Sequence, residues 1–296
     1  MSEKKPVATA PGFDKPEYKE LISLVNPRLT PEPRRRSDLL DFEHYDRTGE
    51  ELYIETINDE DAVDPFDEGL APEDYWAEGW DFGSPLAYRH DTYQYDDIAC
   101  RMFPTRYRIA DFNLSRGFRR VLKKNADLQC VARPFRITPA KDALDQLHCY
   151  SRFQEIRAPL SSLYAKPVFR CAPQHELTVF HPTRGLIAFS IIDIGENASY
   201  AVRTAWTPDE KQRSLGTYTF LKTVEYAQSL GFEHHYVGPT ILADPAFSYK
   251  LRFPACEVYD WEANDWVESE TERAKAMFAA PLLGRRWNPE TEDWAE

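Results

Sequence analysis

The feature that most constrains the fold is a change of hydrophobic period between residues 176 and 206. Three apolar stretches of strand-like composition, ELTVFH, LIAFSIID and ASYAVRTAW, are separated by turn residues at PTRG and GEN. β-Branched and aromatic residues bounded by short glycine-containing turns are typical of antiparallel hairpins. This segment therefore predicts an antiparallel three-stranded meander.

A helical pattern follows the meander. The segment RSLGTYTFLKTVEYAQSLG predicts a helix of about fourteen residues that ends at Gly231, because glycine readily takes the left-handed conformation that closes a helix. HHYVG predicts a short buried strand, PAFSYKLRF a short helix, and CEVYDWEANDWVES a closing hairpin. This order of elements resembles the GNAT-type acyltransferase fold. We expect an α/β (α+β) protein with a mixed, mostly antiparallel sheet and helices on both faces.

A second feature is a cluster of cations in GFRRVLKKNADL, residues 117–128. We expect a helix here, capped by Ser115, because serine accepts hydrogen bonds from the first backbone N–H groups of a helix. Helical spacing places five cations on one face: Arg116, Arg119, Arg120, Lys123 and Lys124. A solvated face and a phosphate-binding face both fit this pattern.

The charge of the chain is unevenly distributed. The net charge is −13, yet residues 101–170 carry 15 basic and 5 acidic residues, whereas residues 1–100 carry 25 acidic and 10 basic ones. A local excess of +10 is the kind of footprint that binding to nucleic-acid phosphates requires. The acidic segment suits a solubility device, or a mimic of nucleic acid that covers the basic block.

Composition divides the chain into four parts. Residues 1–75 are acidic and rich in proline, so we expect them to be largely disordered. Residues 76–170, where aromatic residues become frequent at DYWAEGWDFG and RMFPTRYRIADF predicts a short extended piece, contain the basic helix. Residues 171–270 form the GNAT-like catalytic domain, and residues 271–296 form a C-terminal tail.

Other patterns narrow the class of protein. The five cysteines form no CxxC pair, which argues against a disulfide scaffold and against the usual zinc and iron–sulfur sites. We expect no metal site. The sequence has no apolar run of membrane-spanning length and no signal peptide, so we expect a cytoplasmic protein without a membrane partner.

Three dispersed motifs give the chain a family resemblance. FNLSRGFRRVLKKNADL, RSLGTYTFLKTVEYAQSLGFEHHYVG and FSYKLRF occur in the order found in the aminoacyl-tRNA–protein transferases, the arginyl- and leucyl-transferases. The resemblance covers roughly residues 80–260. The matching residues are Ser115, Arg119, Arg120, Leu122, Lys123, Lys124 and Asn125, then Ser214, Leu215, Gly216, Thr217 and Tyr218, then Tyr236, Gly238, Tyr249, Lys250 and Phe253.

The resemblance implies an aminoacyltransferase. Such an enzyme takes an amino acid from aminoacyl-tRNA, its co-substrate, and forms a peptide bond on an amine, most often the N-terminal residue of a protein. No further cofactor and no DNA partner are implied. The chain departs from the family in lacking the N-terminal cysteine cluster and in reading GPTI where the family has aromatic residues. These departures leave open a tRNA-dependent dipeptide or cyclodipeptide synthase. A CoA-dependent N-acetyltransferase is a second alternative, which the bulky Tyr218 in the expected CoA loop disfavours.

The expected chemistry assigns roles to particular residues. Attack of an amine on an aminoacyl ester needs a grip on phosphates, a donor to the oxyanion and a group that orients the amine. The predicted donor- and tRNA-binding residues are Arg116, Arg119, Arg120, Lys123, Lys124, Ser214, Leu215, Gly216 and Thr217. The predicted catalytic residues are Asp193, Tyr249 and Lys250, and the predicted acceptor or aminoacyl pocket contains Tyr236 and Gly238. Plain alternatives are a turn carboxylate for Asp193, core packing for the tyrosines and a surface cation for Lys250.

Overall fold

The structure is a computed structural model. It describes residues 71–83, 86–89, 91–95, 98–153, 160, 172–242, 245–279, 286–288 and 293–295. Most of the predicted acidic region therefore lies outside the described residues, and residues 71–75 of that region open the first described helix.

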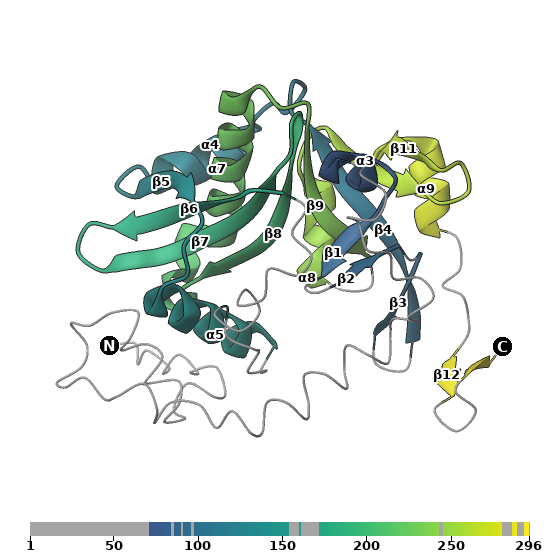
Figure 1. The fold of residues 1–296 in the computed structure, drawn as a ribbon, viewed down its shortest axis with the longest axis horizontal. Helices are drawn as coiled ribbons and strands as arrows, with labels where there is room; N and C mark the ends of the chain where they lie inside the picture. Colours follow the sequence, from purple (N-terminus) through teal and green to yellow (C-terminus); the bar gives the residue numbers. More distant parts are fainter. Residues whose placement is uncertain are drawn as a thin grey trace, which may run out of the picture.

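The described elements include both strands and helices, with runs of consecutive strands at β1–β4 and β6–β8 (Figure 1). The first half contains α3 (Pro72–Ala77), β1 (Asp81–Gly83), β2 (Leu86–Tyr88), β3 (Thr92–Tyr95), β4 (Ile98–Arg108), α4 (Arg116–Lys124), β5 (Gln129–Pro134) and α5 (Pro139–Phe153). The second half contains β6 (Gln174–His181), β7 (Gly185–Ile194), β8 (Ala198–Trp206), η4 (Pro208–Arg213), α7 (Leu215–Leu230), β9 (His234–Ile241), α8 (Pro245–Ser248), η5 (Tyr249–Arg252), β10 (Cys256–Asp260), β11 (Asp265–Glu268), α9 (Glu272–Ala279), β12 (Arg286–Asn288) and β13 (Asp293–Ala295).

The central sheet has the strand order β11-β10-β4-β9-β8-β7-β6-β5. The predicted meander is confirmed, because β6, β7 and β8 pair antiparallel in sequence order. Helix α7 then crosses over to β9, which pairs parallel to β8, since a parallel neighbour needs a helical crossover. Helix α7 ends at Gly231 with φ +75°, as predicted. The structure therefore has the GNAT-type order of a mixed, mostly antiparallel sheet.

Strand β4 is the main departure from the sequence-based prediction. The expected short extended piece is an eleven-residue strand that lies between β9 and β10 in the middle of the sheet. The sequence pattern did not indicate a full central strand because the segment contains Pro104. Proline cannot donate a backbone hydrogen bond to a neighbouring strand and is rare in central strands. A register shift between Pro104 and Arg106 accommodates the proline. The sheet thus contains strands from both sides of the predicted boundary at residue 170.

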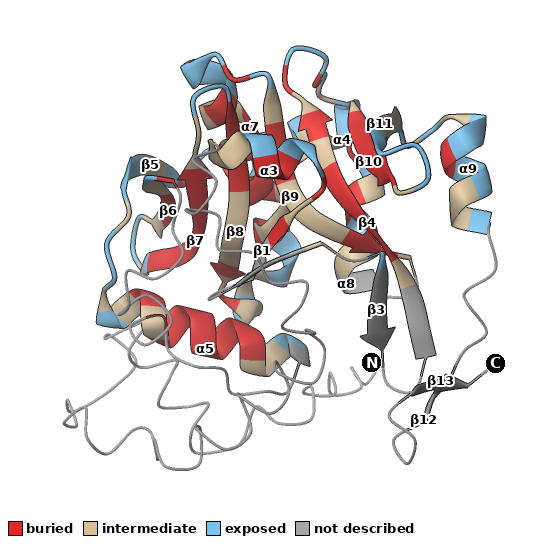
Figure 2. Ribbon diagram, turned by 45° about the vertical axis from the view of Figure 1, so that its right-hand side comes forward, coloured by how far each residue is buried: buried red, intermediate tan, exposed pale blue. Residues whose placement is uncertain are grey.

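Helices cover both faces of the sheet. On one face, Leu144 and Leu147 of α5 pack against β7 through Phe189 and its neighbours. On the other face Leu215 and Tyr218 of α7 pack against Ala188, because successive side chains of a strand point to opposite faces. Figure 2 shows buried residues along β4, β7 and the length of α5. Among the described helices, none is long and apolar enough to cross a membrane.

Helix α9 was not predicted. It lies at the start of the segment assigned to a C-terminal tail, and Ala274 on its inner side is fully buried. Phe278 packs edge-on against Phe103 of β4, with 5.3 Å between ring centres. A helix of eight residues is too short to show a clear hydrophobic periodicity in a polar segment, so the sequence did not indicate it.

Two leucines offer a matched test of the core. Leu144 of α5 has no exposed surface, whereas Leu230 at the end of α7 is 43% exposed. We expect Leu144→Ala to lower the free energy of unfolding by ~2–5 kcal/mol, because it leaves a cavity between α5 and the sheet. Leu230→Ala should change it by about 0.5 kcal/mol or less. Urea unfolding measures both, and equal losses would contradict this description of the core.

Candidate active site

The site is organised around the point where β8 and β9 stop pairing. Their parallel register runs from Ala198 opposite His234 to Tyr200 opposite Tyr236. Beyond that position β8 continues to Trp206, while β9 pairs on its other edge with β4 as far as Ile241. The two strands thus share only their first residues, and the paired tyrosines mark the last shared position.

A line of polar and aromatic residues crosses the sheet at this position. Each member lies directly opposite the next one on the neighbouring strand, so all point to the same face. From β6 to β11 the members are Gln174, Asp193, Tyr200, Tyr236, Arg106, Glu257 and Glu268. Seven such residues in one row across the sheet make this face a candidate functional face.

The short helix α3 covers the middle of this line. The ring of Trp76 lies 5.5 Å from that of Tyr200 and 5.8 Å from that of Tyr236, measured between ring centres. The Glu73 carboxylate accepts a hydrogen bond from the backbone N–H of Glu196 at 2.7 Å, which ties α3 to the turn between β7 and β8. A Cβ at Gly195 would overlap this carboxylate, so a larger residue there would displace the Glu73 side chain.

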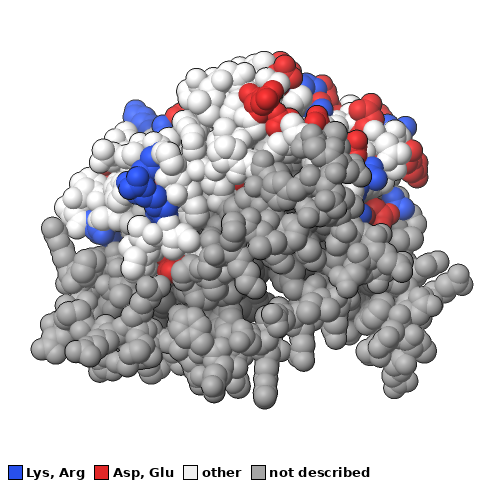
Figure 3. All heavy atoms as spheres, in the orientation of Figure 1, with Lys and Arg blue, Asp and Glu red and all other residues white. Residues whose placement is uncertain are grey.

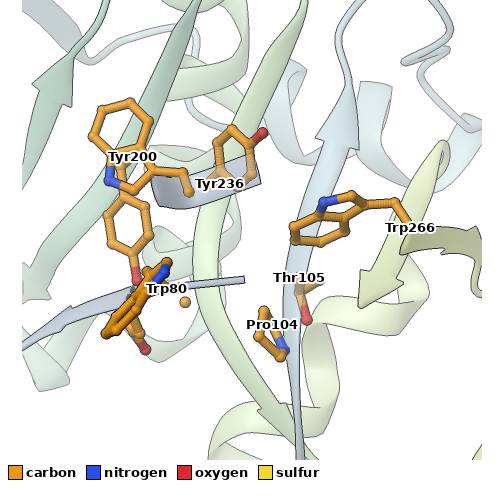
Figure 4. A pocket seen from close by; sticks show the side chains of 9 residues that line it. Trp80, Pro104, Thr105, Tyr200, Tyr236 and Trp266 are labelled. Carbon is orange, nitrogen blue, oxygen red and sulfur yellow. Dashed lines mark hydrogen bonds between the residues drawn. The ribbon is translucent and has the colours of Figure 1, made fainter. Parts of the chain in front are cut away.

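A pocket opens between α3, β1 and the sheet (Figure 4). It is shallow: its 190 Å³ of empty space includes open solvent, and there is room for about one water molecule. The lining residues are Trp76, Trp80, Asp81, Pro104, Thr105, Tyr200, Tyr236, Gly238 and Trp266. The structure therefore brings the predicted pocket residues Tyr236 and Gly238 together, although their role in binding a substrate stays a prediction.

Gly238 determines how closely β9 approaches the pocket. Its φ is +67°, and an added Cβ would lie 3.2 Å from the Tyr200 hydroxyl and 3.5 Å from Asp81 Oδ2. The Tyr200 hydroxyl donates a hydrogen bond to the Asp81 carboxylate. Glycine thus leaves space for this hydroxyl–carboxylate pair beside the strand.

Asp193 lies next to the pocket in the line but does not belong to its lining. Instead of opening into a cleft at the end of β7, its side chain is buried and accepts a hydrogen bond from Gln174 Nε2 at 2.5 Å. Asp193 is also opposite Tyr200 in the β7–β8 register. Its proposed part in catalysis stays a prediction.

Lys250 is buried, so the alternative of a surface cation is wrong. Its ammonium donates a hydrogen bond to the Pro239 carbonyl and lies 5.3 Å from the centre of the Phe247 ring. Burial lowers the pKa of Lys250 to about 8, while the charge of Asp81 raises it. Tyr249 is 37% exposed, and the Arg252 guanidinium lies 5.6 Å from its ring centre.

The SLGTY motif begins α7 and mainly packs the helix. Leu215 is buried in the core, so its side chain cannot contact a donor. The predicted donor-binding role of Leu215 could therefore apply only to its backbone. A Cβ at Gly216 would lie 2.8 Å from the Trp206 ring, so glycine is needed here for side-chain packing. Thr217 Oγ1 accepts a hydrogen bond from Arg252 at 2.8 Å. Ser214 has φ +54° and precedes the helix.

The basic helix forms as predicted. The Ser115 hydroxyl accepts from the Phe118 N–H at 3.3 Å, and Phe118 packs into the core on the inner side of α4. Two of the five cations also make structural contacts. Arg119 donates to the Leu114 carbonyl, and Lys124 donates to the Gln212 carbonyl just before α7, both at 2.5 Å.

The other three cations of α4 project into solvent. Arg116, Arg120 and Lys123 are exposed and form no ion pair or hydrogen bond with the described residues. Asn125 follows them and donates to the Arg213 carbonyl at 2.9 Å, which holds the end of α4 against the start of α7.

The surface in Figure 3 shows cations over the β5–β7 side and acidic side chains gathered near α3 and β11.

The two groups of residues occupy opposite faces of the sheet. Helices α4 and α7 lie on one face, where His235 of β9 points toward Thr223 of α7. The neighbouring Tyr236 points to the other face, beneath Trp76. The separation of β8 from β9 lies between them. A parallel strand pair that separates beside a helix N-terminus, with a pocket at the separation, defines a GNAT-type acyltransferase.

Comparison with known proteins narrows this class. Residues 136–260 match the family model described as "Arginine-tRNA-protein transferase, C terminus". An "Aspartate/glutamate leucyltransferase" of Xanthomonas euvesicatoria pv. vesicatoria is 29% identical over 212 residues, covering 67% of this chain and 82% of that protein. The protein of the same name from Pseudomonas fluorescens is 30% identical over 164 residues, covering 52% of this chain and 67% of that protein. The chain belongs to this family of aminoacyl-tRNA–protein transferases.

Solved structures show partial likeness. FemX has a TM-score of 0.38 at 8% identity, covering 52% of this chain and 57% of that one. A GCN5-related N-acetyltransferase from Kribbella flavida has a TM-score of 0.28 at 11% identity, covering 53% of this chain and 56% of that one. Each match thus spans little more than half of either protein.

Sequence reasoning missed seven of the nine lining residues of the pocket, among them Pro104 and Thr105 of β4. Trp76, Trp80 and Asp81 lie in the aromatic stretch DYWAEGWDFG, which indicated only where order begins. Tyr200 and Trp266 lie inside predicted strands. The local sequence of these strands did not indicate which residues of other strands would lie beside them in the pocket. Among the described residues, no three His, Cys, Asp or Glu side chains are grouped so that they could hold a metal ion.

Two glycines with positive φ test the pocket. We expect Gly238→Ala and Gly185→Ala each to lower the free energy of unfolding by about 1–2 kcal/mol, because alanine is strained in this conformation. Gly185 has φ +78° and nothing within 4 Å of an added Cβ, so it controls for backbone strain. Only Gly238→Ala should also reduce aminoacyl transfer, by displacing Tyr200 and Asp81. Urea unfolding and a transfer assay measure the two effects, and equal transfer by both variants would contradict this function for Gly238.

The pKa of Lys250 predicts a dependence of stability on pH. Its pKa is about 8 in the folded chain and 10.5 when exposed, so the unfolded chain binds more protons between these values. Stability contributed by this residue therefore rises as pH increases from 8 to 10.5. We expect the free energy of unfolding of the wild type to increase over this range relative to Lys250→Met, measured by urea unfolding. A difference independent of pH would contradict the shifted pKa.

Proposed function

We propose that this protein transfers an amino acid from aminoacyl-tRNA to the α-amino group of a protein's N-terminal residue. Its family membership and the names of its relatives support this proposal. Those relatives are named for aspartate and glutamate as acceptors and for leucyl transfer. For this chain we propose an acidic N-terminal residue as the acceptor.

The observation that carries the proposal is the placement of two unlike sites on either side of one strand separation. The exposed cations of α4 lie beside the start of α7. Lysine and arginine on such a surface attract the phosphates of RNA, and a helix N-terminus adds backbone N–H donors. The aromatic pocket lies on the opposite face, at the last paired position of β8 and β9. The aminoacyl end of a tRNA held at α4 would reach the pocket through this separation.

The reaction needs little beyond positioning. The acceptor nitrogen attacks the ester carbonyl carbon, the bond from that carbon to the ribose oxygen breaks, and the ribose hydroxyl leaves with a proton. An aminoacyl ester is already activated, so holding both reactants in line supplies most of the rate enhancement. The attacking amine must first lose a proton. A carboxylate can accept that proton, which is the part predicted for Asp193. We propose that Lys250, whose pKa burial lowers to about 8, can accept it as well.

The start of α7 disfavours a CoA donor. A pyrophosphate loop needs small residues so that the backbone can approach the phosphates. Here the Trp206 ring packs directly against Gly216. Tyr218 is buried in the core, and this burial raises the pKa of its hydroxyl to about 12. These side chains fill the space that the smaller residues of a CoA loop would leave.

A transfer assay tests the proposed function. The protein would be incubated with tRNA charged with one radiolabelled amino acid at a time, and with peptides that begin with aspartate, glutamate or alanine. We expect label in a peptide bond on the acidic peptides. Label that appears instead in a dipeptide with a free amino acid would replace the protein acceptor by a small amine. If no charged tRNA is consumed, the proposal is wrong.

The salt dependence of tRNA binding tests α4 separately. We expect replacement of Arg116, Arg120 and Lys123 by glutamine to weaken binding and to reduce the slope of log K against log salt by about 0.7–0.9 for each phosphate that the variant no longer neutralises. Lys275 of α9 is exposed and far from α4 in the sequence, so Lys275→Gln is the control. Binding isotherms at several salt concentrations give the slopes. An unchanged slope in the triple variant would show that α4 does not bind tRNA.

A further inference from the structure

The short helix η5 presents an aromatic ring and a cation to solvent. Tyr249 is 37% exposed and Arg252 is exposed as well, whereas Lys250 of the same helix is buried. The Arg252 guanidinium lies 5.6 Å from the centre of the Tyr249 ring. Among the described residues, the exposed large hydrophobic side chains are Ile137, Leu230 and Tyr249, and the last alone is aromatic. The exposed ring and the exposed cation are therefore neighbours.

Arg252 carries a charge that no carboxylate among the described residues neutralises. Its guanidinium donates a hydrogen bond to Thr217 Oγ1 at 2.8 Å and lies 5.3 Å from the centre of the Phe253 ring. Thr217 belongs to the first turn of α7, so this hydrogen bond holds the guanidinium beside the N-terminus of a long helix. The positive end of the helix dipole and the guanidinium both favour an anion at this place.

The pair also lies next to the basic helix. Phe118 on the inner side of α4 stacks on Phe253, with ring centres 4.7 Å apart and planes at 13°. Phe253 thus contacts both α4 and Arg252. The cation of η5 and the exposed cations of α4 therefore belong to one side of the molecule.

The strand separation is close to this pair. Lys250, which follows Tyr249, donates to the Pro239 carbonyl in the part of β9 that no longer pairs with β8. At the end of β8, Arg152 of α5 lies 5.5 Å from the centre of the Trp206 ring. Part of Tyr249 is buried, and this burial raises its pKa, while the positive charge of Arg152 lowers it. Helix η5 therefore lies near the ends of both separated strands.

An exposed ring beside an unneutralised cation suits single-stranded nucleic acid. The bases of a single strand can stack on an aromatic ring, while a neighbouring cation neutralises a phosphate. Bases in a duplex remain stacked on one another, so a duplex offers only its backbone and groove edges. The amino acid of an aminoacyl-tRNA is carried on the unpaired 3′ end that follows the paired acceptor stem. The cations of α4 thus suit the stem, and the pair on η5 suits the unpaired end.

We propose that Tyr249 and Arg252 bind the unpaired 3′ end of the donor tRNA, with a base stacked on Tyr249 and a phosphate paired with Arg252. This inference rests on the proposed function, because it takes the tRNA as held at α4. It gives Tyr249 a role in binding in place of the predicted role in catalysis. A strand held there carries its aminoacyl ester to the position where β8 and β9 stop pairing.

Binding of two RNAs separates the unpaired end from the stem. Full-length tRNA would be compared with a transcript of the same tRNA that stops at the last base pair of the acceptor stem. We expect the wild type to bind the full-length tRNA at least about tenfold more tightly. Tyr249→Leu should lower this ratio at least about fivefold, because it removes the stacking ring, whereas Tyr249→Phe should retain it.

The dependence of binding on salt tests Arg252. Arg252→Gln should reduce the slope of log K against log salt by about 0.7 for the full-length tRNA, the value for one phosphate of a single strand, and leave the slope for the shortened RNA unchanged. Replacement of Arg116, Arg120 and Lys123 by glutamine should weaken binding of both RNAs and keep their ratio. Lys275→Gln on α9 is the control and should change neither the ratio nor the slopes.

The outcomes distinguish this inference from the proposed function. Equal binding of the two RNAs by the wild type overturns the inference alone, because α4 still holds the tRNA. A ratio unchanged in Tyr249→Leu, or a slope unchanged in Arg252→Gln, also overturns it. If the wild type binds neither RNA, the proposed function is wrong and the inference is wrong with it. The wild-type comparison stands even if a variant fails to fold.

Discussion

The early end of the β8–β9 pairing is the constraint on which the rest of the site depends. Helix α7 returns the chain to a strand parallel to β8. Beyond Tyr200 and Tyr236 this strand, β9, pairs only with β4 on its other edge. A continuous sheet would isolate its two faces. Here the pairing ends, and under the proposed function the acyl group of a donor bound on the α7 face would pass to the α3 face at this position.

The two faces differ in their chemistry. On the α7 face, cations project from a helix whose inner side is fixed in the core by Phe118, and this arrangement suits a polyanion held by charge rather than by shape. On the α3 face, aromatic rings and the buried carboxylate Asp81 line a small pocket.

The motif that gives the family resemblance mostly builds the scaffold. In SLGTY, Leu215 and Tyr218 are core residues, and the Trp206 ring packs against Gly216. Three of the five positions of the motif therefore pack α7 onto the sheet. The pocket instead takes Trp76 and Asp81 from a segment without a motif. The parts of a sequence that make a family recognisable can thus be those that position a site rather than those that line it.

The sequence alone determined the meander, helix α7 and the capped basic helix α4, because hydrophobic period, glycine at a helix end and serine at a helix start are local signals. It also indicated that Tyr236 and Gly238 belong to one pocket. Only the tertiary structure placed β4 in the middle of the sheet, buried Lys250, and joined Trp76, Tyr200 and Trp266 around Asp81. Those arrangements depend on strand register between segments far apart in the chain, and a local pattern does not specify which distant strand will become its neighbour.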